Sequence, residues 1–434
     1  MRMKSSVGVR ARVKEGFLGV VAAAMVLFCF CGQVRARYHF DVTPALSVSE
    51  QYDDNIYLSE RNEKSDYITS VSPSLNLGFR AQHTDLDLRY GPSFVFYDDQ
   101  DRNDTVRHSG SLSFGRQLGR HLRMSLSDTL TRSEEPIEEA EDVEGVRSNR
   151  EPYYRNNASG SLNYIFGQGD SITLGYGHAW LKNDDKTVDN GITQTPNASL
   201  TYSFNVQNSV TLTYGYTKAE FWRDEGTAGD DYTGHSAGLR YTYRFTKHTS
   251  ASLGYNFSTR NFDGDTEEYK VHDGSLDFSH AFSRDFSVSM GAGYFKQDKD
   301  VSKDQKGYSY NLDFSKRIER GSLSIGGRGG WDEAYLEAER RGFSKYYSGT
   351  ASADYQVLEP LKVFAGGSYR LDRQADGREW KTWSGNCGLS WSFLRWFSLS
   401  LTYTYRQRDD DIDTDDYEVN QVMLTLSGSR LFRW

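Results

Sequence analysis

The chain has 434 residues, of which 37% are hydrophobic and 14% aromatic, and its mean hydropathy is −0.70. This low hydropathy excludes a bundle of membrane-spanning helices, and a net charge of −9 argues against nucleic acid as a partner. High aromatic content at low hydropathy is typical of a transmembrane β-barrel, where only every second residue must be apolar.

Residues 1–36 have the features of a secretory signal peptide. Basic residues are frequent in the first 14 positions, residues 16–31 are apolar, and Val34-Arg35-Ala36 fits a small-residue cleavage site. The apolar run is shorter than the ~20 residues that a spanning helix needs, so we expect removal rather than anchoring. The predicted mature domain, residues 37–434, retains only Cys387 and therefore forms no internal disulfide.

Residues 232–258 show the pattern that the rest of the chain repeats. Apolar residues alternate with polar residues or glycine from Ala237 to Phe245, and the alternation resumes after Thr246-Lys247. Because successive side chains of a strand point to opposite faces, this pattern predicts an antiparallel hairpin with one apolar face. A mark of three residues recurs about every 35 to 50 positions, which corresponds to one hairpin per period. It consists of a small residue, a leucine and an aromatic residue, each two positions after the one before. A propeller blade would need four strands in that period.

Long polar loops alternate with short turns along the mature chain, as in outer-membrane barrels. The long loops are expected at 53–66, 98–105, 134–151, 184–189, 223–231, 262–268, 298–306, 332–343, 372–379 and 409–416. We predict an all-β, antiparallel, up-and-down transmembrane barrel of about 20 strands, with 18 to 22 acceptable. An even number returns both termini to the periplasmic side. A β-solenoid or a sandwich remains the alternative fold.

The last residues, Leu431-Phe432-Arg433-Trp434, resemble the C-terminal strand signature of bacterial outer-membrane proteins. That signature has an aromatic last residue and another aromatic two positions before it. The resemblance implies that Phe432 and Trp434 are an assembly signal for the barrel-assembly machinery, with Trp434 in place of the more usual Phe.

A second resemblance lies near the mature N-terminus. The segments Thr43-Pro44, Ser49–Ile56, Ser65–Ile68 and Val71–Pro73 resemble the opening strands of a family of outer-membrane β-barrel porins. Some members are encoded among genes for exopolysaccharide production or exosortase-linked surface sorting. The resemblance implies an integral protein of the bacterial outer membrane and a link to exopolysaccharide export.

With the apolar face toward lipid, the opposite face lines the lumen. Predicted pore-lining residues are Arg80, Arg89, Arg123, Arg240, Arg244, Arg260, Asp277, Asp313, Asp354, Arg370 and Arg406. Arg240, Asp277, Asp313 and Asp354 are expected at similar depth, as a charged arc near the periplasmic mouth. A charged ring in a narrow pore would select ions. We favour a solvated wall in which arginines pair with carboxylates.

The loops contain acidic runs, Glu134–Glu139 and Asp409–Asp416. The second run lacks the Gly and Glu of a calcium loop, so we expect a solvated rim rather than a metal site. No nucleophile, base or metal pattern surrounds His108, His178, His235 or His272, and we predict neither enzymatic activity nor a cofactor.

We therefore expect a channel for passive passage of hydrophilic solutes, with membrane lipid and the assembly machinery as partners and polysaccharide or a small solute as cargo. The alternative is a non-conducting surface barrel whose acidic loops bind polysaccharide or a partner.

Overall fold

The computed structural model describes residues 38–135, 138–140, 143–144, 150–334, 342–375, 377–412 and 415–434. The predicted signal peptide lies outside them. Within these ranges, no helix has the length and apolarity required to cross a membrane.

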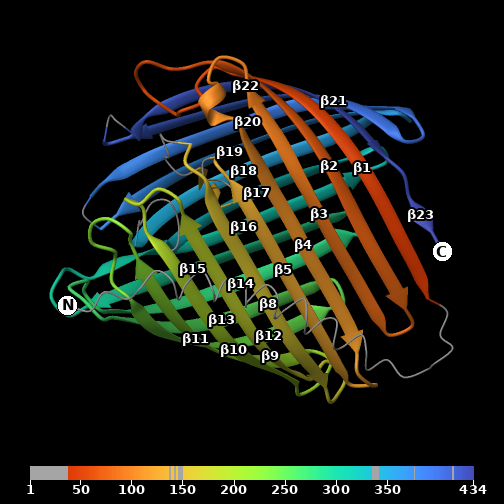
Figure 1. Cartoon of the computed structure of the whole chain (residues 1–434). Coiled ribbons are helices and arrows are strands. Elements are labelled where there is room, and N and C mark those ends of the chain that lie inside the picture. Colours follow the sequence, from red (N-terminus) through yellow and green to blue (C-terminus); the bar gives the residue numbers. More distant parts are fainter. Residues whose placement is uncertain are drawn as a thin grey trace.

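Twenty long strands form a closed antiparallel barrel, which Figure 1 shows from the side. In the described residues the strands are β1 (His39–Asp53), β2 (Asp66–Ala81), β3 (Thr84–Tyr97), β4 (Thr105–Gln117), β5 (Leu122–Ser133), β8 (Tyr153–Ile165), β9 (Ser171–Asn183), β10 (Asn190–Ser203), β11 (Asn208–Trp222), β12 (Tyr232–Thr246), β13 (Thr249–Phe262), β14 (Tyr269–Ser283), β15 (Phe286–Lys299), β16 (Gln305–Ile318), β17 (Gly321–Ala334), β18 (Gly342–Leu358), β19 (Leu361–Gln374), β20 (Glu379–Leu394), β21 (Phe397–Asp410) and β22 (Tyr417–Ser429). The predicted fold class and strand number are confirmed.

Short segments complete the secondary structure. A two-residue strand, β23 (Phe432–Arg433), ends the sheet, and a one-turn helix, η1 (Asp101–Asn103), follows β3. The strands β6 (Glu138–Ala140) and β7 (Val143–Glu144) form a separate pair between β5 and β8. Short turns such as Gln82-His83 join the strands at one end of the barrel, and longer segments such as 223–231 join them at the other.

The outer face of the barrel is apolar. Leu212, Leu239 and Leu253, on three consecutive strands, are 48%, 49% and 62% exposed. Aromatic residues lie above and below such leucines: Tyr164, Tyr202, Tyr241, Phe278 and Trp391 toward the short turns, and Tyr90, Tyr176, Tyr214, Tyr255, Tyr294 and Tyr403 toward the loops. An apolar band between two aromatic girdles is the surface that a bilayer covers. The leucine-bearing faces therefore meet acyl chains.

The barrel closes where its first strand meets its last. β1 pairs with β22 from Ala45↔Ser429 to Asp53↔Gln421, and β23 extends the pairing. The backbones of Phe40 and Trp434 exchange two hydrogen bonds of 3.0 Å. The rings of Phe432 and Trp434 stack with 6.2 Å between centroids. Closure satisfies the backbone groups that an open sheet edge would expose to lipid.

Candidate functional site

One wall of the barrel interior is rich in hydroxyl groups, and its inward charges are the arginines Arg107, Arg123 and Arg155. Residues opposite in phase to the outward leucines of β4–β11 face inward, and most are Ser, Thr, Asn or Gly. Hydroxyl groups pair across neighbouring strands: Ser125 with Ser161 at 2.8 Å, Ser127 with Ser159 at 2.7 Å, and Thr201 with Thr211 at 3.1 Å. This wall offers many weakly held donors and acceptors to solute and water.

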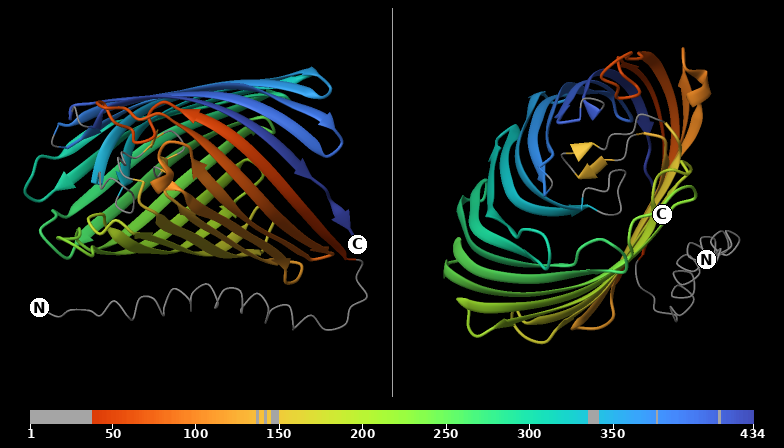
Figure 2. Two further views of the ribbon diagram at one scale, coloured as in Figure 1. Left: turned by 45° about the horizontal axis from the view of Figure 1, so that its top comes forward. Right: turned by 90° about the vertical axis from the view of Figure 1, so that its left-hand side faces the viewer.

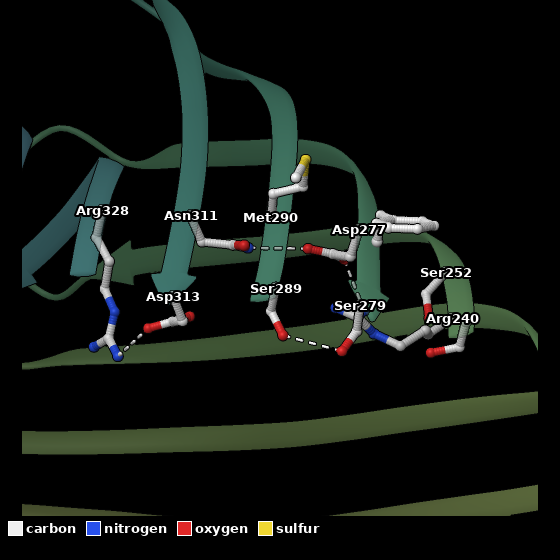
Figure 3. A pocket seen from close by; sticks show the side chains of 11 residues that line it. Arg240, Ser252, Asp277, Ser279, Ser289, Met290, Asn311, Asp313 and Arg328 are labelled. Carbon is white, nitrogen blue, oxygen red and sulfur yellow. Dashed lines mark hydrogen bonds and ion pairs between the residues drawn. The ribbon is translucent and has the colours of Figure 1, made fainter. Parts of the chain in front are cut away.

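The adjoining wall carries a charged arc on β12–β17. Arg240 Nη1 lies 2.8 Å from Asp277 Oδ2, and Asn311 Nδ2 donates to Asp277 Oδ1 at 2.9 Å. Arg328 lies 4.0 Å from Asp313. Figure 3 shows these side chains beside a cavity of about 440 Å³ that serines also line. The structure thus brings three of the four predicted arc residues together, already partnered.

Asp354, the fourth predicted residue of the arc, lies further around the wall. It pairs with Lys362 at 3.2 Å and accepts a hydrogen bond from Ser322. Arg80 pairs with Asp87 at 2.6 Å toward the short-turn end. Each of these inward charges has a partner of opposite sign.

Two predicted pore-lining arginines face inward but are covered. Arg260, with a side chain 13% exposed, pairs with Glu333 at 2.6 Å. Arg370, 4% exposed, pairs with Asp372 at 2.7 Å and with Asp332 at 3.1 Å. Both link strands rather than bordering open water. The remaining predicted arginines lie on inward positions of their strands, namely Arg89, Arg123, Arg244 and Arg406.

A buried ion-pair network lies at the loop end of the barrel, and we call it the mouth network: Tyr97, Arg107, Glu134, Glu135 and Arg150. Arg107 Nε donates to Glu134 at 2.9 Å, and a second contact joins Arg107 to Glu135. Arg150 Nη1 donates to Tyr97 Oη at 2.9 Å and lies 3.0 Å from Glu135. The network therefore ties both ends of the β5–β8 loop to the wall.

The mouth network corrects the expectation that the acidic loops form a solvated rim. Glu134 is only 2% exposed. In the second acidic run, the side chain of Asp410 is fully buried and pairs at 2.7 Å with both Arg378 and Arg408. The expected rim is wrong for these residues because arginines of the barrel wall and of the β19–β20 connection neutralise them. Among the described residues, no His, Cys, Asp or Glu cluster is placed to hold a metal ion.

Two elements enter the interior at the loop end. The β6–β7 pair lies inside the ring of strands when the barrel is viewed along its axis (Figure 2, right). The ends of β17 and β18 also pack inward, where Phe343 belongs to a buried cluster with Tyr269, Phe295 and the ring of Trp331. A barrel of this width would hold an open aqueous lumen, and these elements narrow the half at the loop end.

The sequence Asp53-Asp54-Asn55-Ile56 joins the barrel seam to the mouth network. Asp54 Oδ1 accepts from the backbone N–H of Asn420 at 2.7 Å, and Asn55 Nδ2 donates to the carbonyl of Glu418 at 3.0 Å. The carbonyl of Ile56 accepts from Arg150 Nε at 2.8 Å. This segment thus fastens the first loop to the last strand and holds one arginine of the mouth network.

Residues 39–168 match the family model described as putative beta-barrel porin 2. The predicted resemblance to a family of β-barrel porins is confirmed for this segment. Among curated proteins, none matches the sequence. The porin-family segment contains the Asp53–Ile56 sequence and all five residues of the mouth network.

Solved structures share the fold at low sequence identity. The ferric enterobactin receptor PfeA of Pseudomonas aeruginosa, in complex with enterobactin, is 9% identical over 92% of this chain and 82% of its own, with a TM-score of 0.53. The siderophore receptor PirA of Pseudomonas aeruginosa is 11% identical over 89% and 80%, with a TM-score of 0.50. OccAB4 of Acinetobacter baumannii is 12% identical over 91% and 98%, with a TM-score of 0.41.

Proposed function

We propose that the protein is an outer-membrane channel for passive passage of hydrophilic, mainly uncharged solutes. The observation that carries the proposal is the hydroxyl-rich wall of β4–β11, beside an arc on β12–β17 whose charges are paired with one another. Paired charges produce a weak net field beside the arc, so ions gain little by binding there. A hydroxyl-rich solute can exchange its hydrogen bonds with water for bonds to Ser, Thr and Asn at small cost.

Surface polysaccharide is the cargo that we propose for this channel. The support is the porin-family resemblance together with the hydroxyl wall, whose donors and acceptors suit sugar hydroxyls. Short turns lie at the same end as both termini of the mature chain, so we also propose that the termini face the periplasm.

The second candidate is a non-conducting barrel that binds polysaccharide or a partner at its surface. The elements that narrow the outer half of the lumen favour it, since a closed mouth would leave only the loops for recognition. No enzymatic reaction is assigned to either candidate.

Planar-bilayer recording and liposome swelling together test the proposal. The channel should give steady single-channel current, a reversal potential near zero in a KCl gradient, and faster swelling in neutral oligosaccharide than in uronic-acid oligosaccharide of equal length. An absence of both current and swelling would refute the channel and leave the surface-binding candidate. Faster entry of the uronic acids would refute the preference for uncharged solutes while keeping the channel.

A further inference from the structure

The pairing of β16 with β17 ends early at the loop end of the barrel. Within the described residues, the two strands pair only as far as Tyr310↔Gly329. β16 continues to Gln305 beside β15, and β17 continues to Ala334 beside β18. Residues 305–309 therefore form a strand edge that pairs with no described segment, and such an edge is unfavourable in a membrane protein.

The end of β17 instead lies over the inner face of the neighbouring strands. Trp331 Nε1 donates to Asp273 Oδ2 of β14 at 3.1 Å. Glu333 reaches one strand further, to Arg260 of β13 at 2.6 Å. The hydroxyl of Tyr269 also donates to Glu333, at 2.9 Å. These contacts hold the end of β17 inside the lumen, and we call this arrangement the docked position.

The sequence of β17 also fits β16 if the strand register is continued beyond Gly329. Trp331 would then come opposite Tyr308, which is 74% exposed and is the register partner of the girdle residue Tyr294. Glu333 would come opposite Lys306, on the same face of the sheet. An aromatic pair and a pair of opposite charges directly across two strands both stabilise a sheet. We call this second arrangement the paired position.

The docked position is not favourable for every group around it. Gln297 of β15 is fully buried, and neither its amide oxygen nor its amide nitrogen has a hydrogen-bond partner in the part of the chain that the structure describes. Nε2 of Gln305, its register partner on β16, is also buried without a partner there. Buried amide groups without partners are unfavourable. The contacts of the docked position are therefore partly offset by groups that it leaves unsatisfied.

We propose that residues 330–333 of β17 form a gate that exchanges between the docked and the paired positions. In the exchange, Glu333 leaves Arg260 on the inner face and pairs with Lys306 on the outer face. The paired position completes the wall beside β16 and removes the end of β17 from the lumen, which becomes wider at the loop end. The edge of β16 is thus a docking site for a segment of this same chain. Two packings of one segment with different partners are a known basis of switching.

Disulfide formation between positions 308 and 331 measures the paired position. In a Cys387→Ser background, Tyr308→Cys/Trp331→Cys should form this disulfide when native outer membranes are oxidised with copper phenanthroline. The continued register places the two Cβ atoms about 4.5–5.5 Å apart, close enough for a disulfide after small adjustments. Tyr308→Cys/Lys345→Cys is the matched control, because Lys345 is the partner of Trp331 on β18 and lies two strands from β16.

Substitutions in the Tyr308→Cys/Trp331→Cys protein distinguish the gate from a loosened loop end. Arg260→Ala leaves Glu333 buried without its cation in the docked position, so disulfide formation should be at least about fivefold faster. Lys306→Glu places like charges opposite each other in the paired position and should slow the reaction at least about threefold. Lys270→Glu, at an exposed position on β14, is the control and should leave the rate unchanged.

Heat-dependent gel mobility shows that each variant is folded, and Tyr269→Phe replaces Arg260→Ala if that variant assembles poorly. No disulfide between positions 308 and 331 in any background, a yield equal to that of the control pair, or a faster reaction with Lys306→Glu would overturn the proposal. The disulfide is read on gels and requires no current, so the result is independent of the proposed channel function.

Discussion

Substitution of Arg150 by alanine tests whether the mouth network holds the β5–β8 loop inside the lumen. The Arg150 side chain is 4% exposed and contacts Ile56 at 2.8 Å, Tyr97 at 2.9 Å and Glu135 at 3.0 Å. Removing one partner of a fully buried ion pair costs about 3–5 kcal/mol. Glu135 is 34% exposed and keeps Arg107 as a partner, so a loss of about 2 kcal/mol is the appropriate magnitude.

A loss of about 2 kcal/mol raises the population of the released loop about 30-fold. Single-channel recording of Arg150→Ala should therefore show a higher-conductance state with a correspondingly larger share of open time. Arg61→Ala is the matched control, because the Arg61 side chain is 75% exposed in the first loop and its ion pair within the described residues is with its neighbour Glu60. Identical traces from wild type and Arg150→Ala would show that the network does not set the pore width.

Three further predictions concern pH, selectivity and the seam. Burial opposes ionisation of Glu135, but the two arginines of the mouth network outweigh it and lower its pKa below the ordinary 4.5. This stabilisation is present above pH 4.5 and is lost as pH falls through the depressed pKa, so conductance should stay constant from pH 7 to 4.5 and rise below it. Asp277→Asn leaves Arg240 without its counter-charge and should make the channel anion-selective by reversal potential, with stability changed by less than about 1 kcal/mol; unchanged selectivity would place the arc outside the ion path. Asn55→Ala removes hydrogen bonds at the seam and should destabilise the barrel by about 1–3 kcal/mol, seen as a lower midpoint of heat-dependent mobility on gels, whereas an unshifted midpoint would make this loop dispensable for closure.

The strand arrangement could be predicted because it follows from a local rule. Alternation of period two, repeated with polar breaks, fixes which side chains face outward and where hairpins turn. The pairing of Arg240 with Asp277 followed from the same rule, since matching Leu positions align neighbouring strands. The lengths of the loops could also be predicted, because runs of polar residues separate the alternating segments.

The mouth network could not be predicted in this way. Arg150 and Tyr97 are 53 positions apart, and their contact depends on the β5–β8 loop turning inward, which no periodic pattern encodes. The acidic residues of that loop look solvated in sequence because their partners are distant along the chain: Arg107 lies on β4 and Arg150 at the far end of the loop. The nearest signal was the polar sequence Asp53-Asp54-Asn55 beside an apolar Ile56, which is unusual for a loop that only faces water.

The seam joins groups at opposite ends of the polypeptide, since the hydrogen bond from Asn420 to Asp54 spans 366 positions. Until the final strand is synthesised and delivered, the backbone groups along one edge of β1 have no pairing strand. Any other nascent strand could pair with that edge. The entropy of bringing such distant segments together makes this last step slow. A chain that is truncated before its last strand therefore cannot close into a smaller barrel. It remains an open, curved sheet that must be shielded or degraded.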